Sequence, residues 1–169
     1  MTKHIFTNAS PDSLVLKEVV KAEVFRPLPG GGYPEEPSET LCVGDLIVAT
    51  GRTYLAQRIR SGDTVASAMN YMVVGTVTVA ATLTDTLVTG EVMRKVLSYG
   101  SASNNVFSAV ATFGGAADSL TGIALTEAGI TNHAGSGMGT LYQRVTFSAW
   151  TPAASDLLKL TLQTNVGSS

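Results

Sequence analysis

Residues 141–162 read LYQRVTFSAWTPAASDLLKLTL and contain two runs in which apolar and polar side chains alternate. In the first run, Leu141, Val145 and Phe147 share one face. In the second run, residues 158–162, a leucine occupies every other position. Successive side chains of a β-strand point to opposite faces, so a period of two indicates a half-buried strand. The stretch therefore predicts two strands, separated by a turn that contains proline and aspartate.

Shorter apolar segments, with turn residues between them, precede this stretch. They predict strands at 71–74, 92–99, 106–113 and 121–130. The later segments have no helix between them, and the dozen or more residues that a parallel crossover needs are missing. The expected fold is therefore all-β: an antiparallel β-sandwich, jelly-roll-like, with one short helix and an extended N-terminal arm.

The one predicted helix covers residues 46–60, LIVATGRTYLAQRIR. Asp45 precedes it as a candidate N-cap, and a Ser-Gly-Asp sequence directly after it ends it. Gly51 weakens the middle of this helix by about 1 kcal/mol relative to alanine. The expected apolar face consists of Val48, Leu55 and Ile59.

The N-terminal region differs in residue composition from the rest of the chain. Residues 14–26, LVLKEVVKAEVFR, favour a strand because β-branched residues dominate and a proline follows directly. A helix is the alternative, since several apolar residues also fall roughly at helical spacing. In a strand, Val15, Val19 and Val24 are the side chains expected to need burial.

Residues 27–37, PLPGGGYPEEP, contain four prolines and three consecutive glycines. Such a run holds neither a helix nor a central strand. It is either a long surface loop or a tether that lets an N-terminal arm reach a neighbouring subunit. The predicted division of the chain is an arm with its linker at 1–40 and a sandwich domain at 41–169.

Composition excludes several classes of protein. Hydrophobic residues make up 44% of the 169, enough for a core, whereas charged residues make up only 14%. The formal net charge is −2 and shows no basic excess for binding nucleic acid. Cys42 is the single cysteine, which excludes an internal disulfide framework. No apolar run is long enough to cross a bilayer.

Residues that carry chemistry are sparse. The two histidines are His4, near the N-terminus, and His133, in the Gly-rich loop 131–139, where a turn residue is expected. Ser136 lacks the flanking glycines of a nucleophile elbow. The loop also lacks the Lys-Ser/Thr ending of a phosphate-binding loop. We therefore expect no catalytic residue, no metal site and no cofactor, and we expect that the protein is not an enzyme.

Acidic residues are expected to be structural. Five aspartates each lie beside Gly, Thr or Ser, as capping and turn residues do; these are Asp45, Asp63, Asp85, Asp118 and Asp156. Glu127 shares strand parity with Ile123 and Leu125, which points it toward the core. Arg144 follows in a hairpin arrangement, so a structural Glu127–Arg144 pair is expected. The alternatives are a catalytic acid, or a strand bulge that leaves Glu127 in solvent.

One group of proteins shows these segments in the same order. The chain has a helix at 45–60, a strand ending in glycine at 71–75, and a Thr-rich stretch leading to Glu-x-x-Arg at Glu91 and Arg94. A Glu-Ala-Gly segment at 127–129 follows, before a Gly-rich loop. The order ends with a Thr-Phe-Ser strand end at 146–148 and an Asp-x-Leu turn at Asp156 and Leu158. This order resembles small tailed-bacteriophage virion proteins over about residues 45–169. Two departures are the TVTVAAT sequence after Gly75, where the group has a Gly- and Pro-rich turn, and the first 40 residues, which match nothing in it.

The resemblance implies a non-enzymatic structural protein of the virion. A capsid decoration (cement) protein or another accessory shell component suits the weakly charged, Thr- and Ser-rich composition. The alternative is a tail, collar or fibre component that contacts a receptor, for which Trp150 and a few tyrosines are the available aromatic side chains. The expected partners are other virion proteins, such as the major capsid protein or tail and neck proteins, and further copies of the chain. No direct contact with nucleic acid or membrane is expected.

Overall fold

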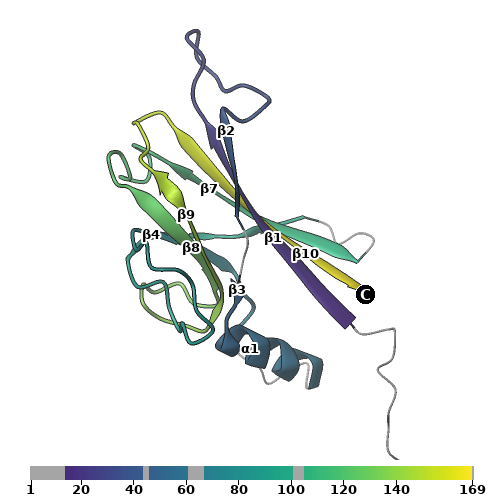
Figure 1. Cartoon of the computed structure of the whole chain (residues 1–169). Helices are drawn as coiled ribbons and strands as arrows, with labels where there is room; N and C mark the ends of the chain where they lie inside the picture. Colours follow the sequence, from purple (N-terminus) through teal and green to yellow (C-terminus); the bar gives the residue numbers. More distant parts are fainter. Residues whose placement is uncertain (1–13, 44–45, 61–66, 101–104, 169) are drawn as a thin grey trace, which may run out of the picture.

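The computed structural model describes residues 14–43, 46–60, 67–100 and 105–168. Two antiparallel five-stranded sheets pack face to face, which confirms the predicted all-β sandwich (Figure 1). The first sheet has the order β2 (Glu39–Val43), β1 (Leu14–Phe25), β10 (Leu157–Ser168), β7 (Val106–Gly114) and β6 (Ser98–Tyr99). The second has the order β3 (Leu46–Ile47), β9 (Leu141–Trp150), β8 (Leu125–Thr131), β4 (Tyr71–Gly75) and β5 (Glu91–Val96).

The main core lies between the sheets. From the first sheet it receives the predicted leucines of β10, which are at most 2% exposed, together with Phe113 of β7. From the second sheet it receives residues of β4, β8 and β9, including Met72, Ile130 and Val145. The predicted shared face of β9 is wrong at Leu141, which belongs to the second cluster, whereas Tyr142 is in the main core. The alternation read from the sequence of β10 is thus the alternation between core and surface.

Both edges of the sandwich are formed by segments that pass from one sheet to the other. Only Leu97, which is buried, separates β5 in the second sheet from β6 in the first. On the opposite side, β2 in the first sheet is followed two residues later by β3 in the second. A strand edge that continues into the facing sheet offers little exposed ladder for pairing with another chain.

The predicted division at residue 40 is wrong, although the strand predicted at residues 14–26 is confirmed as β1. β1 lies between β2 and β10, and all twelve of its residues pair with β10 of the same chain. Residues 14–25 are therefore an integral strand of the sandwich. The predicted burial of Val24 is confirmed, and Val20 and Ala22 join it in the core, whereas Val19 is half exposed. The side chain of Val15 lies outside what the structure describes. The run of prolines and glycines is the connection between β1 and β2, and it projects beyond the sheets (Figure 1).

The helix is present but begins later than predicted. α1 covers Ala49–Arg60, because residues 46–47 pair with β9 as β3 instead of starting the helix. Val48 therefore precedes the first turn, where its carbonyl accepts from the Arg52 N–H at 3.1 Å. Asp45, the predicted N-cap, lies outside the described residues, and Val48 is the residue directly before α1.

Gly51 has a packing role that the sequence did not reveal. A Cβ atom at this position would lie 2.0 Å from the carbonyl oxygen of Tyr142 in β9. No real side chain fits there, so α1 approaches the end of β9 closely only because residue 51 is glycine. Val48 strengthens this contact, since its N–H donates to the same carbonyl at 3.2 Å.

Candidate functional site

The outer face of the second sheet is covered by the segment between β4 and β5, residues 76–90. Val88 of this segment is buried against Val73, Leu141 and Val48 in a second, smaller apolar cluster. The Leu83 carbonyl accepts from the Ala49 N–H at 2.9 Å, which ties the segment to the start of α1. We call residues 76–90 the cover segment. It makes the outer face of the second sheet a buried interface.

Glu127 lies beneath the cover segment, and a bulge in β8 puts it there. The pairing of β8 with β9 shifts between Leu125 and Glu127, so these residues do not share a face as strict alternation predicts. Leu125 packs in the main core, whereas Glu127 faces outward with 0% exposure. The predicted burial of Glu127 is confirmed, but the predicted direction, toward the main core, is wrong.

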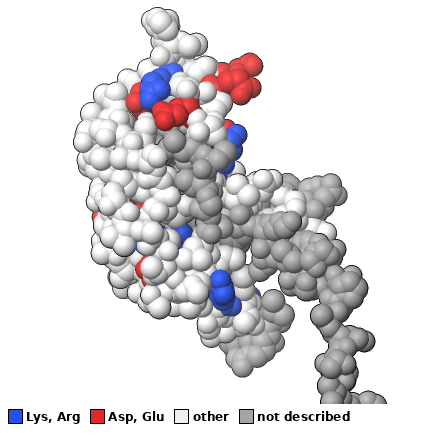
Figure 2. All heavy atoms as spheres, in the orientation of Figure 1, with Lys and Arg blue, Asp and Glu red and all other residues white. Residues whose placement is uncertain are grey.

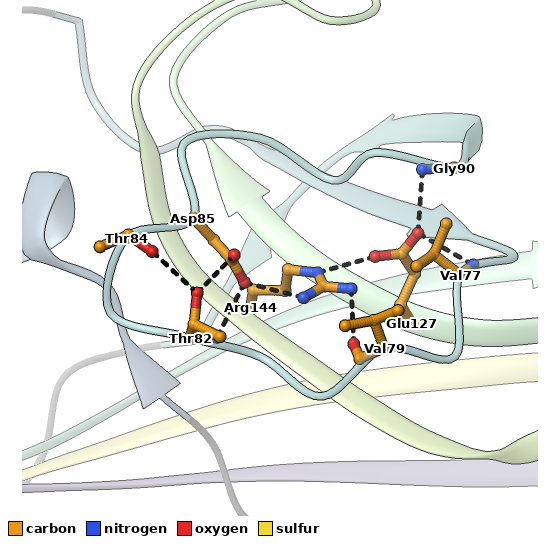
Figure 3. Close-up of polar contacts among 8 residues, drawn as sticks. All are labelled: Val77, Val79, Thr82, Thr84, Asp85, Gly90, Glu127 and Arg144. Atoms are coloured by element: carbon orange, nitrogen blue, oxygen red, sulfur yellow. Dashed lines mark hydrogen bonds and ion pairs between the residues drawn. The ribbon is translucent and has the colours of Figure 1, made fainter.

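Glu127 and Arg144 form the ion pair that the sequence predicted. The Arg144 Nε lies 2.8 Å from Glu127 Oε2, and both side chains are almost fully buried. The other carboxylate oxygen, Oε1, accepts from the backbone N–H groups of Val77 and Gly90, each at 3.1 Å (Figure 3). The carboxylate thus holds the first and last parts of the cover segment together.

Arg144 makes two further contacts that the sequence did not predict. Its Nη1 donates to Asp85 Oδ2 at 2.7 Å, and its Nη2 donates to the Val79 carbonyl at 3.0 Å (Figure 3). Asp85 also accepts from the N–H and hydroxyl of Thr82, at 2.9 and 2.7 Å. The signal in the sequence was that Asp85 is the single charged residue among the fifteen of the cover segment.

The charges of this cluster are stabilised in place. Burial acts to raise the pKa of Asp85, but the hydrogen bonds from Thr82 and Arg144 outweigh it and lower that pKa. The two carboxylates beside Arg144 likewise outweigh the effect of burial and raise the pKa of its guanidinium. Both shifts favour the charged forms of Asp85 and Arg144 at neutral pH.

A close approach of backbones keeps this cluster compact. A Cβ at Gly75, the last residue of β4, would lie 2.5 Å from Glu127 Oε1 and 2.8 Å from the Gly90 carbonyl. The strand therefore has to end in glycine for the carboxylate to fit. This explains in physical terms the strand end in glycine noted in the sequence.

The chemistry open to the Glu127–Arg144–Asp85 cluster is restricted. Each of the three side chains is engaged with the others or with the cover segment, and Glu127 and Arg144 have no exposed face for a substrate. A general acid needs access to the group that it protonates. The geometry therefore fits a clamp that fastens the cover segment onto the sheet.

A second charged pair fastens the Gly-rich loop 131–139. Arg94 and Glu91 form a bidentate pair, with Nε–Oε1 and Nη2–Oε2 distances of 2.6 Å. Glu91 also accepts from the Gly137 N–H at 3.0 Å, and Arg94 donates to the His133 carbonyl. Burial acts to raise the pKa of Glu91, and its bonds with Arg94 and Gly137 outweigh that effect and lower it.

His133 has the environment of a turn residue. Its Nδ1 accepts from the Gly135 N–H at 2.9 Å, within its own loop. In the part of the chain that the structure describes, no carboxylate orients its ring. Ser136 lies in the same loop, where its side chain is bonded to Glu91. His4 and the side chain of Cys42 lie outside what the structure describes.

The remaining aspartates with described side chains act as turn residues, as predicted. Asp118 accepts from the Gly114 N–H at 2.5 Å and pairs with Lys95 at 2.7 Å. Asp156 accepts from the Ala153 N–H at 3.1 Å. Asp63 is not among the described residues. Among those that are, no group of three or more His, Cys, Asp or Glu residues is placed to hold a metal ion, and no helix is long and apolar enough to cross a membrane.

Comparisons with known proteins give no match: no family model, no curated protein and no solved structure is similar to this chain.

Proposed function

We propose that this chain is a non-enzymatic structural protein of a tailed-bacteriophage virion, and that it binds the assembled shell as a decoration protein. The order of segments in residues 45–169, described above, supports the class of protein. The observation that carries the choice of role is the outer surface of the cover segment. The segment turns its one charged side chain inward to Arg144 and exposes apolar side chains instead.

The exposed side chains of the cover segment are large for a free surface. Val79 is 67% exposed, and Leu83 and Leu87 are each more than 40% exposed. Three large exposed apolar side chains within one fifteen-residue segment support a contact with another macromolecule. The Glu127–Arg144–Asp85 cluster holds this surface in a fixed shape, which lowers the entropy cost of association.

The distribution of charge supports a protein partner. In Figure 2 most of the visible face is uncharged, and acidic and basic side chains lie close together at the end where the β1–β2 connection projects. Phosphate backbones are bound by continuous basic surfaces. A surface of this kind favours packing against another neutral protein surface.

Stabilisation of the particle then follows from mass action. A protein that binds the assembled shell and not its dissociated subunits stabilises the shell by an amount that grows with its concentration. The many equivalent positions of a shell multiply this effect.

One observation favours the alternative role in a tail, collar or fibre. The β1–β2 connection projects from the sandwich and exposes Leu28 and Tyr33, and an exposed tyrosine suits contact with a receptor. Trp150, the residue best suited to stacking on a sugar, is buried in the core. The role as a decoration protein therefore explains more of the exposed apolar surface than a role in the tail, collar or fibre does.

Copy number and a surface variant test the proposal together. Quantitative mass spectrometry of purified particles should find hundreds of copies per virion, whereas tens or fewer would move the protein to the tail or neck. Val79→Asp should reduce occupancy on particles about tenfold, because it places a charge in the apolar contact. The matched control is Val19→Asp, at a half-exposed valine on the outer face of the first sheet. Equal occupancy of both variants would contradict a contact through the cover segment.

A further inference from the structure

A cavity of about 360 Å³ lies between the two sheets at the end of the sandwich next to α1. Both sheets and the helix contribute to its wall, and the side chains that define it are Tyr54, Leu97, Ala109, Ile130, Tyr142 and Leu162. Among the residues that line it, none is charged. The volume lies within the range of small-molecule sites in proteins, which starts at about 300 Å³.

The cavity is partly open to solvent, so water reaches its mostly apolar wall. Apolar surface in contact with water is unfavourable roughly in proportion to its area. Water compensates poorly, because a water molecule needs two to four polar partners and the wall is almost wholly apolar. The cavity is therefore suited to an apolar molecule.

Arg58 of α1 contacts Tyr54, one of the residues that line the cavity. The guanidinium of Arg58 lies over the Tyr54 ring, 5.5 Å from its centroid, and its Nε donates to the Tyr54 hydroxyl at 3.0 Å. That hydroxyl in turn donates to the Ser67 carbonyl at 3.4 Å, directly before Ala68 and Met69 of the lining. No acidic side chain of the described residues pairs with Arg58. A guanidinium carries five N–H donors, so Arg58 can bind an anion in addition to the Tyr54 hydroxyl.

We propose that this cavity binds a single-chain amphiphile, with the alkyl chain between the sheets and a carboxylate at Arg58. The volume lies at the lower end of the range for small-molecule sites, which favours one alkyl chain of moderate length over a two-chain lipid. Decanoate, a carboxylate with ten carbons, is a suitable probe. This site is separate from the exposed surface of the cover segment, so its test is independent of the proposed role in the virion.

The test is binding of decanoate to the full chain, measured by isothermal titration calorimetry below the concentration at which decanoate forms micelles. The unmodified protein should bind one decanoate in a saturable manner. Arg58→Gln should weaken decanoate about tenfold, and it should change the binding of decanol less than twofold. Arg58→Lys keeps the charge and should retain most of the affinity for decanoate.

A second pair of variants tests the location. Ala68→Trp places a large side chain at an exposed position of the lining and should abolish binding of both probes. Ala56→Trp makes the same change at an exposed position of α1 away from the cavity, and should leave binding unchanged. Absence of saturable decanoate binding to the unmodified protein would overturn the proposal. Binding that survives Ala68→Trp, or an equal loss of both probes in Arg58→Gln, would overturn it as well.

Discussion

The two faces of the second sheet are both buried, but they are covered by different kinds of partner. The inner face packs against the first sheet through side chains such as Met72, Ala128 and Ile130. The outer face combines a small apolar cluster with the buried charges of Glu127 and Arg144, and a segment without regular secondary structure covers it. An antiparallel sheet commonly leaves its polar face in water. Here a loop excludes the water, so the polar residues had to be paired.

The two faces of the second sheet are also held by contacts of different physical character. Apolar contacts between the sheets are non-directional and tolerate exchange of similar side chains. The contacts beneath the cover segment are directional, because each carboxylate oxygen meets a particular N–H group. The inner face should therefore govern whether the chain folds, and the outer face should govern the shape of the exposed surface.

The largest effect is expected from deleting residues 1–40. This removes β1, which pairs along its whole length with β10 and buries Val20, Ala22 and Val24. The inner face then loses part of its cover, and the chain should lose its cooperative thermal transition, measured by circular dichroism. Leu28→Ser in the exposed connection is the control and should change the free energy of unfolding by less than about 0.5 kcal/mol. A soluble truncated domain with a sharp transition would instead make the N-terminal strand an accessory arm.

A large but smaller effect is expected on the outer face. Glu127→Ala leaves Arg144 buried without its main partner and should lower the free energy of unfolding by about 3 kcal/mol. Chemical denaturation of Glu127→Ala, Arg144→Ala and the double variant measures the coupling between the two residues. The double variant should be about 2 kcal/mol more stable than the sum of the single effects predicts. Additive losses would show that the two side chains do not act as a pair.

Gly51→Ala tests the packing of α1 against the end of β9. Alanine favours helix by about 1 kcal/mol in isolation. The clash of its Cβ with the Tyr142 carbonyl reverses this preference, and we expect a net loss of about 2 kcal/mol of unfolding free energy. Gln57→Ala, at an exposed position of the same helix, is the matched control and should be neutral. A Gly51→Ala variant as stable as the parent would mean that α1 moves away from β9 without cost.

The smallest effect concerns acid pH. The pKa values of Asp85 and Glu91 are lowered in the folded state, so both groups bind protons more readily when the chain is unfolded. Their stabilisation is fully present above the ordinary carboxyl pKa of about 4 and is lost as the pH falls through the lower folded values. Asp85→Asn should cost about 1 kcal/mol at pH 7 and should flatten this acid-induced loss in denaturation curves recorded between pH 7 and pH 2. An unchanged pH profile in Asp85→Asn would remove Asp85 from the cluster that secures the cover segment.

Local pattern predicted the buried face of β10 correctly, but in β9 it put Leu141 in place of Tyr142 in the main core. β10 and β4 lie where alternation and apolar runs predicted them, and the leucines of β10 are in the core. In β8 the prediction failed because Leu125 and Glu127 depart from strict alternation. The bulge before Glu127 sends that side chain to the outer face, and no local signal distinguishes a bulge from a regular strand.

Contacts between residues far apart in the sequence were predicted only in part. The Glu127–Arg144 pair was predictable because the two strands are adjacent in sequence. The Arg144–Asp85 contact spans 59 residues, and it depends on how the cover segment folds back over the sheet. The same holds for β1: its strand character is local, whereas its pairing with β10 is a property of the whole fold.

The sequence by itself therefore determined the fold class, the positions of most strands, the helix and one buried ion pair. These follow from side-chain periodicity, backbone propensity and the cost of burying a lone charge, all of which act over a few residues. Only the tertiary structure decided that β1 is an inner strand, that residues 76–90 cover the outer face, and that a cavity beside Arg58 remains between the sheets. These features depend on contacts between residues far apart in the chain, and the free energy of such contacts is set by the complete fold rather than by any single segment.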